Sequence, residues 1–234
     1  HDTWVFVEDR VVHLFYLSPL VADPTHRLIG HAVSRDWLQW EEWPTIELTG
    51  GSGSWDGGRV GTGYTFRAGD RYYLAYTGRV DPREEIGLAE SDDLVSWRKP
   101  IDGPVCPRPK RAPFAGEVDD GALLPAWRDP FVYRDDAAAP PALVTARSED
   151  DGGDVRRRGC VATCVLESPE MWRVTGCMAV DSGYPIMEVP EIFHLDGAWW
   201  LTFNSGSAWG LDLDTDTRRR SSGTYYLRGE RPGG

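Results

Sequence analysis

The sequence predicts an all-β fold, and two observations carry that prediction. Short segments of alternating β-branched or aromatic and polar residues recur along the chain, whereas no stretch of helix length has an apolar period of 3.6 residues. The chain also contains 26 Gly and 17 Pro residues, spread throughout, which end strands and form turns. Short strands joined by frequent turns are therefore expected from end to end.

An internal repeat specifies the kind of β fold. The segment Ile29–Trp40 aligns with Ile86–Trp97, because both read as an apolar strand, a Ser-x-Asp turn and a Trp that starts the next strand. A degenerate third copy runs from Val161 to Trp172. The first two copies are 86 − 29 = 57 residues apart, and periods of about this size are typical of β-propeller blades, which bury their faces by stacking on one another.

Hairpins precede the repeat copies and mark the start of each unit. The predicted strand pairs, each separated by a polar turn, are 4–7 with 11–17, 64–66 with 72–76, and 191–195 with 198–203. Units start near Asp2, Gly61, Asp129 and Glu188, so about four four-stranded blades are evident. We expect residues 1–234 to form a single β-propeller catalytic domain in which a further blade is incomplete or absent.

The charge balance excludes several classes of partner. Twenty-five Lys and Arg against 37 Asp and Glu give a net charge of −12, which repels nucleic acid and anionic membrane surfaces. No apolar run is long enough to span a membrane. A small-molecule or oligosaccharide substrate fits this charge better. A free sheet edge left by an incomplete ring would also allow pairing with a second copy.

Cofactor and location are constrained less tightly. The four Cys residues have no metal-ligand spacing, and 212–216 begins like a calcium loop but lacks its Gly and final Glu, so no metal is expected. The amino-terminal residues do not read as an export signal, and the chain begins at His1 rather than Met. We therefore expect a cytoplasmic protein unless a leader preceded His1.

Three carboxylates stand at the starts of successive units: Asp2, Asp129 and Glu188. Propellers place their sites at the mouth of the central channel, where the innermost strands of different blades begin. An Asp at a strand start often only caps a turn, but the shared position of these three in the repeat favours a common site. Cleaving a glycosidic bond requires one protonated carboxyl and one ionised carboxylate, which this set supplies without a metal or organic cofactor.

The motifs around these residues resemble glycoside hydrolase family 32 and its relative family 68, with family 43 more distant. The motifs that carry the resemblance are His13-Leu14-Phe15-Tyr16, Tyr76-Thr77-Gly78, Arg128-Asp129-Pro130 and Glu188-Val189-Pro190. The resemblance implies a five-bladed propeller of four-stranded blades that cleaves furanosides. The sequence departs from the family 32 motifs at two places. The first motif reads His1-Asp2-Thr3-Trp4, which is closer to family 68, and Val189 stands where family 32 has a Cys.

The resemblance also implies a role for each candidate residue. Asp2 is the expected nucleophile, Glu188 the acid/base and Asp129 the residue that hydrogen-bonds sugar hydroxyls. Arg128, Trp55 and Trp4 are the expected substrate-binding residues, although a Trp55 that only packs on the edge of the propeller is an equally good interpretation of its Gly-rich loop. Glu191 is a rival for the acid role, but it lies three residues beyond the motif position.

Three functions remain open at this point. The leading one is a retaining β-fructofuranosidase-like hydrolase, or a transferase that uses the same covalent intermediate. An inverting arabinofuranosidase or xylosidase of the family 43 kind is the second, and the separation of the carboxylates would distinguish it. The third is a non-catalytic propeller that binds sugars or a protein.

Overall fold

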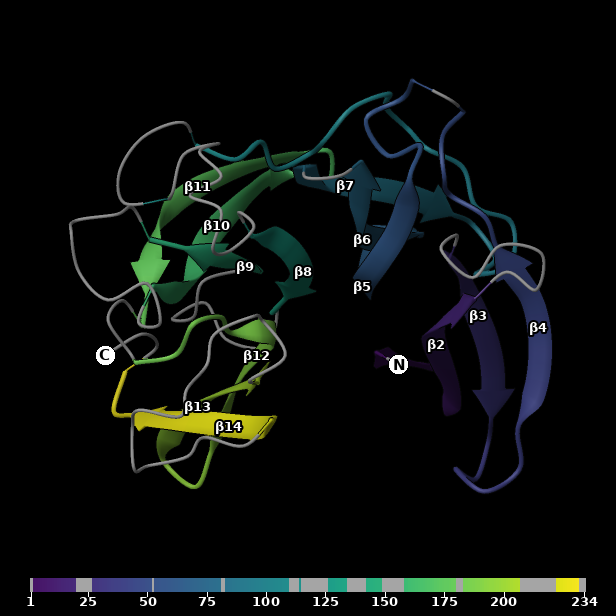
Figure 1. Cartoon of the computed structure of the whole chain (residues 1–234). Helices are drawn as coiled ribbons and strands as arrows, with labels where there is room; N and C mark the ends of the chain where they lie inside the picture. Colours follow the sequence, from purple (N-terminus) through teal and green to yellow (C-terminus); the bar gives the residue numbers. More distant parts are fainter. Residues whose placement is uncertain are drawn as a thin grey trace. The chain divides into compact units, whose positions relative to one another are not determined.

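The computed structural model describes residues 2–19, 27–51, 53–80, 83–109, 114, 126–133, 142–148, 158–179, 183–206 and 222–231. All regular elements in these residues are β-strands, which form four antiparallel sheets (Figure 1). The all-β prediction is therefore confirmed. The described residues include no helix that could cross a membrane. The acidic stretch 212–216 lies outside the described residues.

The chain divides into two compact units, and each is described by itself. Unit 1 consists of residues 1–107 together with 167–171, and unit 2 consists of residues 108–166 and 172–234.

Unit 1 contains two sheets. The first has the order β1 (Thr3–Glu8), β2 (Val11–Pro19), β3 (Arg27–Ser34) and β4 (Glu41–Ile46). The second has β5 (Arg59–Ala68), β6 (Arg71–Val80) and β7 (Arg83–Ser91), and isolated bridges extend it at Glu90–Arg98 and Ile86–Cys106. Strand β5 contacts β1, β2 and β3, and the core between the sheets comprises Trp4, Phe15, Leu17, Ile29, Ile46, Leu48, Val60, Leu74, Tyr76 and Ala89.

The two copies of the internal repeat in unit 1 form equivalent hydrogen bonds. After β3, the Asp36 carboxylate accepts hydrogen bonds from the backbone N–H groups of Leu38 and Gln39, at 2.9 and 2.8 Å. After β7, Asp93 accepts the equivalent bonds from Val95 and Ser96, at 2.8 and 2.7 Å. These backbone bonds lower the pKa of Asp36 and lower the pKa of Asp93 to about 2. The Ser-x-Asp pattern thus produced the same turn twice.

Unit 2 also contains two sheets. One has the order β8 (Trp127–Val132), β9 (Ala142–Arg147), β10 (Gly159–Ser168) and β11 (Met171–Met178). The other has β12 (Glu188–Leu195), β13 (Ala198–Ser205) and β14 (Gly223–Gly229), and β12 contacts β8 and β9. In the third repeat copy the Asp-capped turn is replaced by a two-residue turn at Pro169-Glu170 between β10 and β11.

Two of the predicted hairpins close with the same local geometry. Asp9 and Arg10 join β1 to β2, and Asp196 and Gly197 join β12 to β13, all four with positive φ between 47° and 73°. Two consecutive positive φ values indicate a type I′ turn, whose twist matches that of the paired strands. The polar turns in the sequence therefore placed these hairpins correctly.

The first strand of three sheets is interrupted at a similar place. The pairing register shifts between Val60 and Gly63 in β5, between Arg128 and Phe131 in β8, and between Glu188 and Glu191 in β12. Such bulges turn side chains out of the regular pleat and are frequent beside active sites. Asp129 therefore lies within β8 at a bulge, rather than ahead of the strand as the sequence suggested, whereas Glu188 is the first residue of β12.

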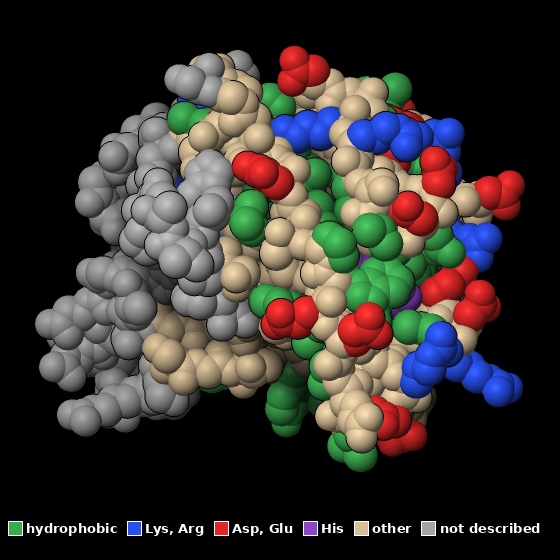
Figure 2. All heavy atoms as spheres, turned by 90° about the vertical axis from the view of Figure 1, so that its right-hand side faces the viewer, with side chains coloured by type: hydrophobic (Ala, Val, Ile, Leu, Met, Phe, Trp, Pro, Cys, Tyr) green, Lys and Arg blue, Asp and Glu red, His purple; other side chains and the backbone are tan. Residues whose placement is uncertain are grey.

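The described surface carries charges of both signs. Figure 2 shows Asp and Glu side chains interspersed with Lys and Arg on the face it presents. On this face, the described charges of the two signs are therefore mixed rather than gathered in one patch.

Candidate active site

Three of the predicted site residues come together in unit 2. The Arg128 guanidinium donates a hydrogen bond to Glu188 Oε1 at 2.9 Å, and its Nε lies 3.6 Å from Asp129 Oδ2. Arg128 and Asp129 are buried, whereas the Glu188 side chain is 24% exposed. We call Arg128, Asp129, Glu188 and Thr145 the open cluster, because one of its carboxylates reaches solvent.

The bulges of β8 and β12 hold the Asp129 carboxylate, the buried carboxylate of the open cluster. Asp129 Oδ2 accepts a hydrogen bond from the backbone N–H of Val189 at 3.1 Å, and the buried Thr145 hydroxyl lies 3.3 Å from the same oxygen. The Thr145 hydroxyl also lies 2.9 Å from the carbonyl oxygen of Met187, just before β12. Asp129 thereby connects β8, β9 and β12 at the point where Glu188 begins its strand.

The backbone at both bulges is strained. Asp129 has φ of +53° and Val189 has φ of +48°, and each precedes a proline. Positive φ is costly for a β-branched residue such as Val, on the order of 1–3 kcal/mol, and such strain is concentrated at functional sites. Pro130 and Pro190 have no N–H to donate to the ladder, so they fit where the pairing is interrupted.

Glu188 forms part of the wall of a pocket of about 390 Å³ in unit 2. The other lining residues are small and polar or are glycines: Asn204, Ser205, Gly206, Ser222, Gly223 and Thr224. A carboxyl that is bound to an arginine on one side and faces a pocket on the other can exchange a proton with a molecule in that pocket.

The rival residue, Glu191, lies further along β12, inside the strand as the sequence indicated. Part of its side chain reaches solvent, yet desolvation of its carboxyl by the surrounding chain raises its pKa. A raised pKa suits a general acid. Glu191 therefore remains a rival to be tested directly against Glu188.

Asp2 lies in unit 1, immediately before β1. Its Oδ2 accepts a hydrogen bond of 2.5 Å from the hydroxyl of Thr62, and its backbone carbonyl accepts one from the N–H of Leu17 at 3.1 Å. The Thr77 hydroxyl in turn donates to the carbonyl of Thr62 at 2.9 Å. These contacts fix both the backbone and one carboxylate oxygen of Asp2.

Thr62 and Thr145 were missed at the level of the sequence. Thr62 lies in the bulge of β5, one residue after Gly61, and Gly61 is the residue that aligns with Asp129 in the bulge of β8. Alignment of the units therefore gave no signal for Thr62. Thr145 lies in the middle of the fully buried strand β9, and nothing in its sequence context distinguishes it from a core residue.

The two predicted substrate-binding tryptophans lie in unit 1. Trp4 is 4% exposed, stacks on Phe15 at a ring-centroid distance of 5.8 Å and donates from its indole nitrogen to Thr65. Trp55 stacks on Tyr76 at 6.1 Å and lies against Gly78 and Gly87, whose missing side chains leave room for its ring. A sugar-binding role for either residue stays a prediction.

A second group of charged residues in unit 1 was not predicted. The fully buried Asp56 carboxylate accepts hydrogen bonds from Lys99 at 2.5 Å, Tyr76 at 2.8 Å, Ser54 at 2.9 Å and the N–H of Gly50 at 3.2 Å. We call these residues the closed cluster. Burial alone would raise the pKa of Asp56, but the bonds from Lys99, Tyr76 and Ser54 outweigh it and lower the pKa.

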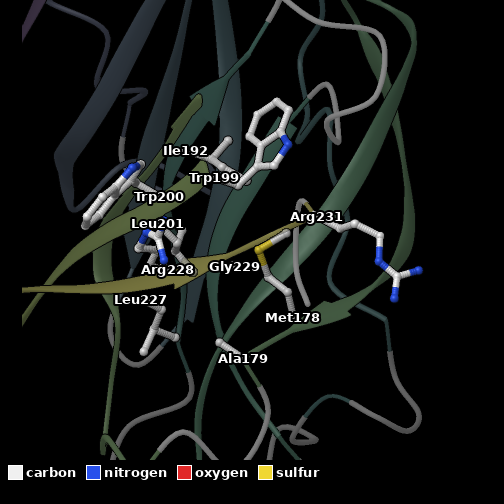
Figure 3. A pocket seen from close by; sticks show the side chains of 10 residues that line it. All are labelled: Met178, Ala179, Ile192, Trp199, Trp200, Leu201, Leu227, Arg228, Gly229 and Arg231. Carbon is white, nitrogen blue, oxygen red and sulfur yellow. The ribbon is translucent and has the colours of Figure 1, made fainter. Parts of the chain in front are cut away.

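Unit 2 contains a further pocket, of about 260 Å³, shown in Figure 3. Apolar side chains including Met178, Ile192 and Leu201 line it, together with Trp199 and Trp200. Arg228 and Arg231 are the charged residues among the described residues of its wall.

The described residues contain no group of three or more His, Cys, Asp or Glu side chains that could hold a metal ion.

Comparison with known proteins assigns the chain to a family. The model of the glycosyl hydrolases family 32 N-terminal domain matches residues 5–231. The chain belongs to glycoside hydrolase family 32. It is 29% identical over 196 residues to a sucrose-6-phosphate hydrolase from Klebsiella pneumoniae, a match that covers 78% of this chain but 37% of that protein. The resemblance read from the motifs is confirmed at the level of the family.

Solved structures show the same fold. A family 32 β-fructofuranosidase from Bombyx mori aligns with a TM-score of 0.60 at 24% identity, covering 96% of this chain and 44% of that one. A family 43 endo-arabinanase from Bacillus licheniformis aligns with a TM-score of 0.60 at 18% identity, covering 100% of this chain and 73% of that one. The fold of the family 32 chain is thus that of the β-propeller glycoside hydrolases, as predicted.

Proposed function

We propose that this family 32 chain is a glycosidase that cleaves β-fructofuranosides with retention of configuration. The observation that carries the proposal is the open cluster, in which Glu188 is bound to Arg128 at 2.9 Å and also lines a pocket. Membership of family 32 supports the reaction class, and the sucrose-6-phosphate hydrolase among its relatives supports a fructoside as substrate.

In the proposed first step, the Asp2 carboxylate attacks the anomeric carbon of the fructosyl unit. The bond from that carbon to the leaving oxygen breaks as the bond to Asp2 forms, and the Glu188 carboxyl gives its proton to the leaving oxygen. Thr62, which donates to Oδ2 of Asp2, leaves Oδ1 to act as the attacking atom.

In the second step, Glu188 takes a proton from a water molecule as that water attacks the anomeric carbon. The bond to Asp2 breaks, and fructose leaves with Asp2 and Glu188 restored to their starting states. Asp129, fixed by Val189 and Thr145, accepts hydrogen bonds from sugar hydroxyls, and Arg128 orients Glu188. Residues 1–234 act in this proposal as one catalytic domain.

The test is hydrolysis of sucrose, inulin, levan and nitrophenyl arabinofuranoside by the full chain and three variants. Asp2→Asn is expected to lower kcat on sucrose by at least on the order of 10⁴-fold, as loss of a nucleophile does. Glu188→Gln is expected to lower it by about 10²- to 10⁴-fold. Glu191→Gln is the matched comparison, with an expected change of less than about threefold, which is within the scatter of peripheral substitutions.

The stereochemistry and the acid role can be tested separately. Reaction in the presence of methanol should trap methyl β-fructofuranoside if configuration is retained. Glu188→Gln should impair cleavage of sucrose far more than cleavage of nitrophenyl β-fructofuranoside, because nitrophenolate needs little protonation to leave. Equal activity of wild type and both the Asp2 and Glu188 variants would overturn the proposal, and cleavage of the arabinofuranoside alone would favour the inverting alternative.

A further inference from the structure

The first copy of the repeated turn in unit 1 exposes apolar side chains where the second copy buries them. In the second copy, Leu94 is 4% exposed and Trp97 packs against the core. In the first copy, Trp37, Leu38 and Trp40 are 57%, 84% and 38% exposed. The two copies make the same backbone hydrogen bonds, so the difference between them lies in the side chains.

The fold gives no reason for a tryptophan in the first copy, whose residues 35–40 we call the tryptophan turn. Trp37 has φ of +66°, a conformation that is costly for a bulky residue, and Leu94 has φ of +63° at the equivalent position. Trp37 therefore has the same backbone strain as Leu94 without being buried. Large apolar side chains that are exposed side by side, unlike single ones, mark binding surfaces.

The two indole rings of the tryptophan turn lie against each other. Their centroids are 6.5 Å apart and their planes meet at 86°, so the edge of one ring is set against the face of the other. Each ring therefore keeps at least one face that the other ring does not cover. The electron-rich face of an indole attracts the partly positive C–H groups of a sugar ring.

Two polar side chains of the same turn can bind the hydroxyls of such a sugar. Arg35 and Gln39 are exposed, and in the part of the chain that the structure describes their side chains have no hydrogen-bond or ion-pair partner. The Arg35 guanidinium offers donors, and the Gln39 amide offers both donors and an acceptor. Sugar hydroxyls match both, because each hydroxyl donates and accepts.

The tryptophan turn lies away from the proposed nucleophile within unit 1. Leu17, whose N–H donates to the carbonyl of Asp2, pairs with Ile29 of β3, whereas the turn follows Ser34 at the other end of β3. The five residues from Ile29 to Ser34 span about 17 Å of extended strand. A ligand at the turn therefore does not occupy the place of the sugar that Asp2 attacks.

We propose that the tryptophan turn is a second, non-catalytic site that binds an uncharged polysaccharide. The choice of a fructan as this polysaccharide rests on the proposed function, whereas the site itself does not. Residues 35–42 contain one cation, Arg35, against the carboxylates of Asp36, Glu41 and Glu42, so an anionic polymer is disfavoured. A polymer held at the turn stays near the chain, which raises its effective concentration for cleavage.

The size of the surface favours a sugar over a second copy of the chain. The exposed parts of the two indole rings and of Leu38 amount to an area on the order of 400 Å². A stable protein–protein interface covers about 800 Å² on each partner. The tryptophan turn is therefore too small for a dimer interface, but it is large enough for one or two stacked sugar rings.

Binding is measured by retardation of the Glu188→Gln chain in native gels that contain levan or inulin, because this variant should leave the polymers intact. Adding Trp37→Leu should weaken binding by about 2- to 12-fold, the range for loss of one aromatic contact. The turn should still fold in this variant, since Leu94 stands at the equivalent position of the second copy. Polygalacturonate, an anionic polymer, should not retard the chain.

Kinetics of the otherwise wild-type chain give a second measurement. Trp37→Leu should lower kcat/KM on levan and leave kcat/KM on sucrose unchanged, because a disaccharide is too short to reach from the turn to Asp2. The matched control is Tyr226→Leu, which removes another exposed aromatic ring, 62% exposed, from β14. This control should change neither the retardation by levan nor either kinetic constant.

Equal retardation with and without Trp37→Leu would overturn the proposal. A dimer in solution that Trp37→Leu converts to a monomer would also overturn it, because the turn would then bind a second copy. Retardation by dextran but not by levan or inulin would refute a fructan as the ligand. The gel measurement needs no catalysis, so a chain that binds levan through Trp37 but cleaves no fructoside would refute the proposed function and leave this site in place.

Discussion

The closed cluster of unit 1 and the open cluster of unit 2 contain the same chemistry in two different settings. In each, a buried Asp is bound by a cation and by a hydroxyl: Asp56 by Lys99 and Tyr76, and Asp129 by Arg128 and Thr145. In the closed cluster both oxygens of Asp56 are bound by donors of the chain itself. In the open cluster the cation also holds Glu188, which reaches a pocket.

The difference shows that a buried charge pair does not by itself identify an active site. Asp56 is the more deeply buried carboxylate and has a lowered pKa, both of which are common at catalytic positions. Its donors, however, leave no room for a substrate. Backbone strain also separates the two clusters, since Asp129 and Val189 have positive φ and Asp56 does not. We therefore expect changes in the closed cluster to alter stability and changes in the open cluster to alter activity.

Asp56→Asn gives the largest expected effect on stability. Breaking a buried ion pair costs about 3–5 kcal/mol, and we expect about 3 kcal/mol because the Lys99 side chain is 25% exposed and can regain some solvation. Urea denaturation of the variant at pH 7 measures this loss. The kcat/KM of the folded variant on sucrose should change by less than about threefold, since Asp56 is placed outside the catalytic machinery.

Glu188→Gln is the control for that experiment. Its side chain is partly exposed, so its free energy of unfolding should change by less than about 1 kcal/mol while its activity collapses. The comparison between the clusters is wrong if Asp56→Asn abolishes activity at full stability, or if Glu188→Gln unfolds the chain.

The histidine pair of unit 1 is a second closed arrangement, and it predicts a pH dependence. His13 Nδ1 and His31 Nε2 are 3.0 Å apart, and His31 is fully buried between Phe15 and Trp43. Burial, reinforced by the nearby His13, lowers the pKa of His31 to about 4, and burial also lowers the pKa of His13, against the opposing effect of Glu8.

The unfolded chain therefore binds more protons than the folded chain between about pH 6.5 and pH 4. The contribution of His31 to stability is fully present above pH 6.5 and is lost as the pH falls from 6.5 to 4, up to roughly 3 kcal/mol. His31→Gln should flatten the curve of unfolding free energy against pH in that window, and the exposed His194→Gln should not. An unchanged slope in His31→Gln would rule out this source of acid sensitivity.

The elements predicted correctly from the sequence are those set by neighbours in the chain. Local contacts, within a few residues, determine the hairpin turns at Asp9-Arg10 and Asp196-Gly197 and the turns at Asp36 and Asp93. The sequence pattern therefore predicts them. The grouping of Arg128, Asp129 and Glu188 depends on residues 60 apart, and it could be anticipated because the repeat places these residues at equivalent strand starts.

The contacts that could not be predicted join residues without any such equivalence. Lys99 reaches Asp56 across 43 residues, and neither residue stands in a repeated motif. Glu188 lies opposite Asn204, and Asn204 lies opposite Thr224, because of the register of two strand pairs, and a slip by one residue would turn Asn204 to the other face. The bulge at Val60 had no signal in the sequence, and the bulge at Asp129 had none beyond Pro130.

The smallest expected effect comes from the repeated turns at Asp36 and Asp93, whose hydrogen bonds join residues close together in the chain. Asp36→Ala and Asp93→Ala each remove a carboxylate that accepts two backbone hydrogen bonds, and each should lower the free energy of unfolding, as the loss of a cap does. The loss should be larger at the Asp93 turn, because Leu94 within it is buried and its carbonyl accepts a bond from Trp97, whereas Trp37 at the equivalent position is 57% exposed. Urea denaturation of the single and double variants measures both costs, which should add because the two turns share no partners. If Asp36→Ala proves the costlier change, burial of the turn is not what sets its contribution to stability.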